Sequence, residues 1–254
     1  AEVPWQQRLY FGALLPRALR GAAAVLVPSE ATRRDVLRLY PLGGLEARVE
    51  VVPEGLPASA APGALPDRLE PGFILAVGTV EPRKNYARLV QAYRLLRAGG
   101  AVPPLVIAGR VGWALGDTLS QIAAEPGVRY LGHVDEPTLA ALYEAAGVLA
   151  FPSLYEGFGL PLLEAMARGI PAIVGSDGAL PELAGGAALP VDPTDPQAIA
   201  TALQSLIADP ALRARLGEEG RKRAAHFTWE AAAAQTLAIL RRIGAPAERK
   251  VAWR

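Results

Sequence analysis

The chain of 254 residues has no cysteine, two histidines and one methionine. Without cysteine it can form neither a disulfide nor a thiolate metal site, and it has no cysteine nucleophile. Since His133 and His226 are the only histidines, we expect no structural zinc site. These absences exclude a disulfide-rich protein and argue against one that is held together by a structural zinc ion.

The sequence also lacks a charge-free run of about 18 apolar residues, so we expect no helix that spans a bilayer. Residues 1–25 contain Arg8, Arg17, Arg20 and two prolines, and they therefore lack the apolar core of a signal peptide. The formal net charge of +1 is too balanced for the basic stripe of a nucleic-acid-binding protein. We therefore expect a cytoplasmic protein that does not bind nucleic acid.

What the sequence does have is a composition suited to a packed core, with 51% hydrophobic and 20% charged residues. Its length allows one large α/β domain or two small ones. Early in the chain, strands are predicted over 22–28 and 48–53, on either side of a helix over 29–40 that Ser29 can cap. The stretch 54–71 is rich in proline and has no apolar period, which indicates a linker.

Beyond that stretch, short apolar runs alternate with helical patterns. This alternation predicts an α/β fold with a Rossmann-like parallel sheet and helices on both faces. Several strands end in Gly or Pro at their carboxyl ends, the edge at which such sheets bind ligands. The predicted strands are 73–77, 105–108, 128–131, 148–151, 171–174 and an edge strand at 189–191, and the predicted helices are 85–98, 118–124, 136–146, 160–168, 195–208, 210–225 and 229–243.

The segment 151–164 combines the end of a strand, a loop with two glycines and a helix that begins near Leu160. Glycines let the backbone approach a ligand closely, and the helix N-terminus adds about half a positive charge, which together favour an anion such as a diphosphate. Glu156 and Glu164 flank this loop, and sugar hydroxyls could donate hydrogen bonds to their carboxylates. An ordinary glycine loop with a surface glutamate and a capping glutamate remains an equal alternative from the spacing alone.

Three further loops follow strands at the same edge. Arg83 and Lys84 lie in a turn fixed by Pro82 and could bind phosphate, or they could form a solvated basic pair at a helix start. Residues 109–113 could be a lid or a plain turn. At 132–134, backbone groups could contact a nucleobase, although a lone histidine such as His133 is more often structural.

Residues 73–243 resemble the C-terminal, nucleotide-sugar-binding domain of the GT-B-fold retaining glycosyltransferases of family 4, also called glycosyl transferases group 1. The resemblance rests on VGTVEPRKN (77–85), IAGRVGW (107–113), the long block 130–195 and FTWEAAAA (227–234). Residues 5–57 resemble the end of that family's N-terminal, acceptor-binding domain. The implied organisation is an N-terminal remnant with the hinge at 1–57, a linker at 58–71, the nucleotide-sugar-binding domain at 72–243 and a tail at 244–254.

The resemblance also implies roles for individual residues. Glu156 would contact hydroxyls of the donor sugar, and Glu164 would contact the ribose. Lys84 would bind the diphosphate, and Arg83 would replace an arginine that many members have where this chain has Thr79. The implied catalytic residues are Glu156, Lys84 and Arg83, and the implied donor site contains Gly78, Thr79, Arg83, Lys84, Gly109, His133, Val134, Glu156, Gly157, Phe158, Gly159, Leu160 and Glu164.

The implied reaction transfers a hexose from a nucleotide-diphosphate sugar to an acceptor with retained anomeric configuration, without a metal or other cofactor. The EPRKN pattern favours a GDP-mannose-type donor, and the acceptor would be a glycan or a lipid-linked molecule. Because most of the N-terminal domain has no counterpart here, we expect a fragment or a truncated protein.

Two alternatives remain open. In the first, the chain binds the nucleotide sugar but is catalytically incompetent, or it dimerises through its N-terminal strand and helix. In the second, residues 8–20 contact the inner face of a membrane peripherally. The competing interpretation of residues 8–20 is a helix, interrupted by Pro16, that packs on the missing domain.

Overall fold

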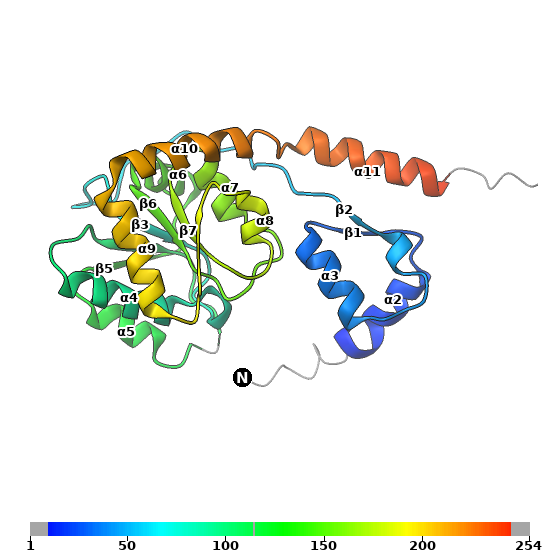
Figure 1. Ribbon diagram of the computed structural model, residues 1–254, viewed down its shortest axis with the longest axis horizontal. Helices are drawn as coiled ribbons and strands as arrows, with labels where there is room; N and C mark the ends of the chain where they lie inside the picture. The colour runs from blue at the N-terminus through cyan, green and yellow to red at the C-terminus, as the bar shows by residue number, and fades with distance from the viewer. Residues whose placement is uncertain (1–9, 114, 245–254) are drawn as a thin grey trace, which may run out of the picture. The chain divides into compact units, whose positions relative to one another are not determined.

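The computed structural model describes residues 10–113 and 115–244 (Figure 1). The chain folds into two compact units, a large one, Leu56–Phe227, and a small one that combines Ala1–Gly55 with Thr228–Arg254. The last helix, α11 (Trp229–Gly244), therefore belongs with the N-terminal residues rather than with the domain predicted over 72–243. Of the tail predicted at 244–254, residues 245–254 lie outside the described residues.

The large unit is built on a six-stranded sheet in which every pairing is parallel. The strand order is β5-β4-β3-β6-β7-β8. The chain therefore builds outward from β3 to β5 and then returns to the other side of β3, which places the topological switch point between β3 and β6. This confirms the predicted Rossmann-like fold. The strands are β3 (Ile74–Val77), β4 (Leu105–Ala108), β5 (Val128–Gly132), β6 (Val148–Phe151), β7 (Ala172–Gly175) and β8 (Leu189–Val191).

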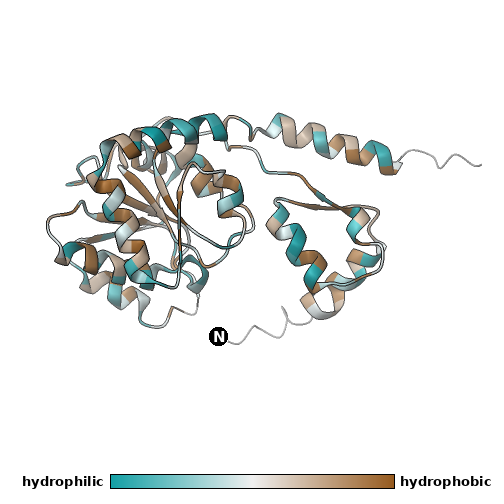
Figure 2. Ribbon diagram, viewed as in Figure 1, coloured by the Kyte–Doolittle hydropathy of each residue, from teal (hydrophilic) through white to brown (hydrophobic). Residues whose placement is uncertain are grey.

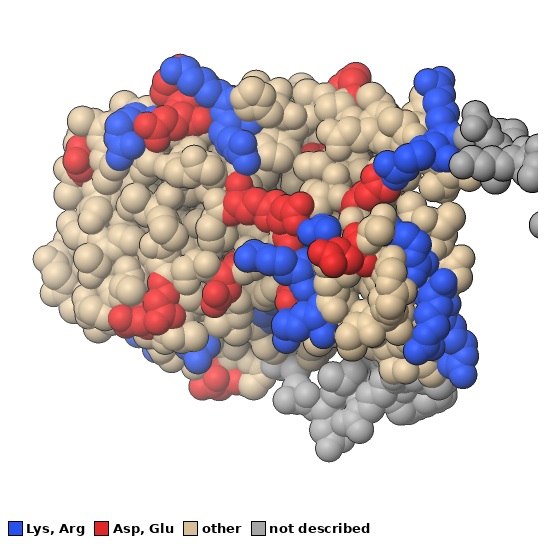
Figure 3. Space-filling model, turned by 45° about the vertical axis from the view of Figure 1, so that its right-hand side comes forward, with Lys and Arg blue, Asp and Glu red and all other residues tan. Residues whose placement is uncertain are grey.

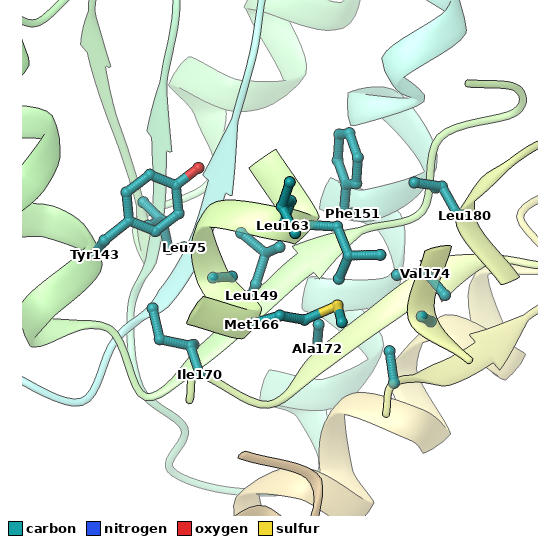
Figure 4. Close-up of a cluster of buried hydrophobic side chains, with 14 of the residues drawn as sticks. Leu75, Tyr143, Leu149, Phe151, Leu163, Met166, Ile170, Ala172, Val174 and Leu180 are labelled. Atoms are coloured by element: carbon teal, nitrogen blue, oxygen red, sulfur yellow. The ribbon is translucent and has the colours of Figure 1, made fainter. Parts of the chain in front are cut away.

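Both faces of this sheet are covered by helices (Figure 1). Successive side chains of a strand alternate between two hydrophobic clusters, so that Leu149 faces one and Ala150 the other. The cluster on the first face, part of which is drawn in Figure 4, contains residues of α6, α7 and α8, and the second contains residues of α4, α5 and α9. The helices are α4 (Tyr86–Ala98), α5 (Thr118–Ala124), α6 (Glu136–Ala145), α7 (Leu160–Ala167), α8 (Leu180–Ala184), α9 (Pro196–Ala208) and α10 (Pro210–Ala224).

Apolar residues are concentrated in the strands, whereas the helices alternate apolar and polar residues (Figure 2). On the surface shown in Figure 3, basic side chains lie among acidic ones. On α10, the pairs Arg215–Glu219 and Lys222–Glu218 are exposed, with nitrogen–oxygen distances of 3.2 and 3.3 Å. Such exposed pairs contribute little to stability individually.

The stretch 58–71, predicted as a linker, is irregular but packs on the large unit. Leu69 is only 6% exposed, and Leu65 packs against the same core cluster. The N–H of Gly63 also donates a hydrogen bond to the carbonyl of Pro137 at 2.9 Å. The prolines prevent regular secondary structure here. The leucines are buried because the removal of apolar surface from water stabilises the folded state.

The small unit contains a parallel pair of strands, β1 (Val25–Val27) and β2 (Val49–Val51). Between them lies α3 (Glu30–Leu39), and Ser29 caps it by accepting a hydrogen bond from the N–H of Thr32 at 3.0 Å, as predicted. Besides α11, the remaining elements are η1 (Tyr10–Leu14), α2 (Leu15–Gly21) and η2 (Glu46–Arg48), and the core contains Leu19, Val27, Leu45 and Val49.

The helical stretch predicted around Pro16 is divided into η1 and α2, which meet just before Pro16, and the proline occupies the first turn of α2, where it is tolerated. Of the segment 8–20, residues 8 and 9 lie outside the described residues. Within the described ranges, no helix combines the length and the apolar character needed to cross a membrane.

Asn85 connects the loops that follow three strands of the large unit. Its side-chain amide donates hydrogen bonds to the carbonyls of Pro152 at 3.0 Å and Pro193 at 2.6 Å. The residue is 3% exposed and has a left-handed backbone with φ of 62°. Asparagine tolerates this conformation better than most residues, so one residue both ends the β3 loop and fastens it to its neighbours.

We expect Asn85→Ala to lower the free energy of unfolding by about 2–4 kcal/mol. The substitution removes the donor to two carbonyl groups and places an alanine in a left-handed conformation. Asn85→Gly removes the same hydrogen bonds, but glycine adopts the left-handed backbone conformation without strain, so this variant should be less destabilising by about 1 kcal/mol. Urea unfolding of the two variants and the parent measures both effects, and equal stability of Asn85→Ala and the parent would contradict the fastening role of Asn85.

Candidate functional site

Two loops meet at the carboxyl edge of the sheet, on either side of the switch point. The first follows β3 and contains the 3-10 turn η3 (Pro82–Lys84), and the second follows β6 and leads into α7. The N–H of Leu154 donates to the carbonyl of Arg83 at 2.8 Å, which joins the two loops through their backbones. Parallel sheets of this type bind ligands at this position.

The side chains of these loops form one ionic cluster. Lys84 Nζ lies 2.8 Å from Glu156 Oε1, and Arg83 donates from Nη1 to Glu156 Oε2. Arg83 also contacts Glu81, with 2.7 Å between Nη2 and Oε1. The side chains of Lys84 and Glu156 are only 10% and 9% exposed, whereas that of Arg83 is 43% exposed. Both carboxylate oxygens of Glu156 are therefore paired with the cations predicted to bind phosphate.

The surroundings of Lys84 restrict it to this place. Its Nζ lies 4.5 Å from the centroid of the Phe151 ring, a favourable cation–π distance. Gly78 has a positive φ of 137°, and a Cβ there would lie 3.0 Å from Lys84 Cε. Burial lowers the pKa of Lys84, while the adjacent Glu156 carboxylate opposes that shift. A partly desolvated ammonium group of this kind interacts strongly with an anion that reaches it.

The glycine loop of 157–159 leads into the N-terminus of α7. Gly159 precedes the first residue of the helix with a φ of 117°, and a Cβ there would lie 2.6 Å from Leu180 Cδ2. Phe158 is 7% exposed and packs in the core against Phe227, so its side chain faces away from solvent. Gly157 and Leu160 are half-buried on either side. The loop thus presents mainly backbone at the end of a helix dipole.

Glu164 has a different environment from Glu156. The buried hydroxyl of Tyr143 donates a hydrogen bond to Glu164 Oε2 at 2.7 Å. Burial raises the pKa of Glu164, although the Tyr143 hydrogen bond and the charge of Arg168 act in the opposite direction. The carboxylate lines a cavity of about 20 Å³ together with Ser59, Glu136 and Leu139.

A larger cleft of about 230 Å³ lies at the carboxyl ends of β3, β4 and β5. Glu136 and Leu139 line both this cleft and the Glu164 cavity, so the two hollows are neighbours. A Cβ at Gly109 would lie 2.0 Å from the Gly78 carbonyl oxygen, which explains why glycine is required where β3 and β4 end. The predicted donor residues that line the cleft are Gly78, Thr79, Gly109, His133 and Val134.

Some contacts at the site were absent from the sequence prediction. Glu81 pairs with Arg83, and its only sequence signal is a carboxylate two residues before an arginine. Tyr143 has no local signal, because it reaches Glu164 from another helix. His133 is exposed, with its Nε2 3.4 Å from Arg110 Nη2.

Metal-binding side chains do not gather in the described part of the chain, where no group of three or more His, Cys, Asp or Glu residues is suitably placed. Independence from metal nevertheless stays a prediction.

The sequence profile of the family described as glycosyl transferases group 1 matches residues 61–223. The O-antigen chain mannosyltransferase B of Escherichia coli is 36% identical over 241 residues, which cover 90% of this chain and 63% of that protein. The MMP alpha-(1->4)-mannosyltransferase of Mycolicibacterium hassiacum is 32% identical over 249 residues, covering 93% of this chain and 58% of that protein. The chain therefore spans less than two thirds of either relative.

Solved structures agree with these sequence relatives. Sucrose-phosphate synthase from Thermosynechococcus elongatus superposes with a TM-score of 0.76 at 29% identity, covering 94% of this chain and 62% of that one. Anabaena HepE in complex with UDP and glucose has a TM-score of 0.73 at 20% identity, covering 91% and 67%, and it supports the fold alone. By its sequence and its GT-B-type Rossmann-like fold, the chain belongs to the glycosyl transferases group 1 family.

Proposed function

We propose that the chain binds a nucleotide-diphosphate sugar at the switch point of its sheet, as the donor-binding part of a hexosyltransferase. One observation carries the proposal: Arg83 and Lys84 from the β3 loop converge on Glu156 from the β6 loop, next to the N-terminus of α7. Cations and a helix N-terminus bind a diphosphate, and a carboxylate can accept hydrogen bonds from sugar hydroxyls.

The cleft of about 230 Å³ at the ends of β3, β4 and β5 has room for a nucleobase. We place the ribose near Glu164 and the base in the cleft beside the backbone of Val134, since the two hollows share Glu136 and Leu139. The diphosphate then lies near Lys84, Arg83 and the amides of residues 157–160. Glu156 contacts the hexose.

In the proposed reaction, the bond between the anomeric carbon and the diphosphate oxygen breaks and a bond to the acceptor oxygen forms. The acceptor hydroxyl loses its proton to the departing diphosphate, and the anomeric configuration is retained. Lys84, Arg83 and the α7 N-terminus stabilise the negative charge that develops on the leaving group. This set of groups requires no metal ion.

The donor that we favour is of the GDP-mannose type, because both curated relatives described above are named mannosyltransferases. We propose a glycan or a lipid-linked molecule as the acceptor, and this chain spans 63% and 58% of those two relatives. For that reason the competing proposal is a nucleotide-sugar-binding module that does not transfer sugar, or that dimerises.

Thermal shift with a panel of GDP-mannose, UDP-glucose and ADP-glucose tests the proposed function. A ligand at 100 times its Kd stabilises the folded state by about 2.7 kcal/mol, and we expect the largest shift with GDP-mannose. A flat response to all three nucleotide sugars would refute the donor site. Hexose transfer by the chain alone would refute the binding-module alternative, and light scattering that shows only monomer would refute dimerisation.

We expect Lys84→Met to weaken GDP binding by about 10–100-fold, because a hydrogen bond to a charged group contributes about 1.5–3 kcal/mol. Calorimetry at low and high salt should show a large loss at low salt and a smaller one at high salt, since screening weakens the removed attraction. Guanosine, which has no phosphate, is the control ligand and should bind both proteins equally. A loss of the same size for guanosine and GDP would contradict a role in phosphate binding.

Glu164→Gln should weaken GDP binding about tenfold through the lost charge-assisted hydrogen bonds to ribose. Burial raises the pKa of Glu164 above its unfolded value, so its protonated form favours folding and this contribution is lost as pH rises through the folded pKa. The glutamine variant, which can still accept from Tyr143, should therefore unfold at higher urea than the parent near pH 7, with the difference shrinking in acid. Equal GDP affinity in both proteins would exclude the ribose contact.

A further inference from the structure

The carboxylate of Glu156 pairs with both cations that the proposed function assigns to the diphosphate. Lys84 lies 2.8 Å from one of its oxygens, and Arg83 donates to the other. Two carboxylates, those of Glu81 and Glu156, thus balance the two cations within the chain. A diphosphate that adds two or more negative charges beside Glu156 must share Lys84 and Arg83 with its carboxylate, and the two anions repel each other.

The backbone around Glu156 is fixed, so the competition concerns its side chain. The carbonyl of Glu156 accepts a hydrogen bond from the N–H of Ala179 at 2.9 Å. The 2.8 Å bond between Leu154 and Arg83 holds the same loop from the other side. Rotation about the side-chain bonds of Glu156 therefore exchanges its partners without a rearrangement of the loop.

From this geometry we infer that Glu156 is an internal competitor of the diphosphate and promotes release of the spent nucleotide. In the absence of phosphate it neutralises Lys84 and Arg83. When the intact donor binds, Glu156 gives up these cations and accepts hydrogen bonds from sugar hydroxyls. Once the sugar has been transferred, Glu156 regains the cations and displaces the nucleoside diphosphate.

Burial determines the direction of this exchange. The Glu156 side chain is 9% exposed, and a carboxylate in such a place is costly unless it is hydrogen-bonded. The donor supplies hydroxyl groups that compensate Glu156, whereas a nucleoside diphosphate supplies none at that position. The difference in affinity between the donor and the nucleoside diphosphate is therefore larger than the hydrogen bonds to the sugar alone would produce.

Glu81 does not serve this purpose equally well. Its ion pair is with Arg83, the more exposed of the two cations, whereas Lys84 is the more buried one. Glu156 pairs with both cations and also precedes the anion-binding loop directly. Neutralising Glu156 should therefore have a larger effect on phosphate binding than neutralising Glu81.

The inference rests on the proposed function, and inorganic pyrophosphate, which carries neither base nor sugar, is the sharpest probe for it. We expect Glu156→Gln to bind pyrophosphate and GDP about tenfold more tightly than the parent, since it loses one charge-assisted competitor. Glu156→Asp keeps the charge and should show no such gain. Glu81→Gln, which neutralises a carboxylate paired only with the more exposed Arg83, should give a smaller gain than Glu156→Gln.

The ratio of GDP affinity to GDP-mannose affinity is the second readout. In Glu156→Gln this ratio should shift toward GDP by about tenfold or more, because GDP gains affinity while the sugar loses its carboxylate partner. If Glu156→Gln is less stable than the parent, the rise in Tm that pyrophosphate causes in each protein still compares their pyrophosphate affinities. Each protein without pyrophosphate is its own reference.

Pyrophosphate and GDP affinities that are unchanged or weaker in Glu156→Gln would overturn the competitor role. A parent protein that binds no nucleotide sugar would instead overturn the proposed function itself, so the two failures are distinct. An equal gain in Glu156→Asp would show that side-chain size, not charge, limits anion binding, and this would also overturn the inference.

Discussion

Two oppositely charged side chains, Lys84 and Glu156, meet at 2.8 Å across the switch point while being about nine-tenths buried. Charges in such a place are tolerated only with a partner, and the partners come from strands that are adjacent in the sheet but 72 positions apart in the chain. The site therefore forms only because β3 and β6 are neighbours in the sheet. Gly78 and Asn85 maintain it, the first by leaving room for Lys84 and the second by fastening the loops together.

The two glutamates of the segment 156–164 differ because of what surrounds them. Glu156 faces two cations, while Glu164 accepts a hydrogen bond from a tyrosine hydroxyl, and burial raises the pKa of Glu164. A carboxylate held by cations is suited to exchange partners with a charged ligand. A carboxylate held by a neutral hydroxyl is suited to stay in place and accept further hydrogen bonds. The same residue type therefore has two chemistries within one loop and helix.

Much of the fold was predictable because the central strands bury both faces and are short, apolar and bounded by glycine or proline. The strands at Leu105–Ala108 and Val148–Phe151 agree with their predicted limits. The five-residue helix α8 was missed because it is too short to show a period. The contacts of Tyr143 with Glu164, and of Glu156 with two cations, were unpredictable locally since they depend on tertiary packing. The burial of leucines in 58–71 was likewise not predicted, because the prolines of this stretch indicated a linker.

A crystal structure with GDP-mannose tests most directly whether a nucleotide sugar binds where the carboxyl ends of β3 and β6 meet. We expect a diphosphate oxygen within about 3 Å of Lys84 Nζ, a typical charge-assisted hydrogen bond, with the hexose hydroxyls at Glu156. A donor bound elsewhere, for example in the hollow lined by Arg168 and Arg213, with the Lys84–Glu156 pair intact, would contradict this central claim.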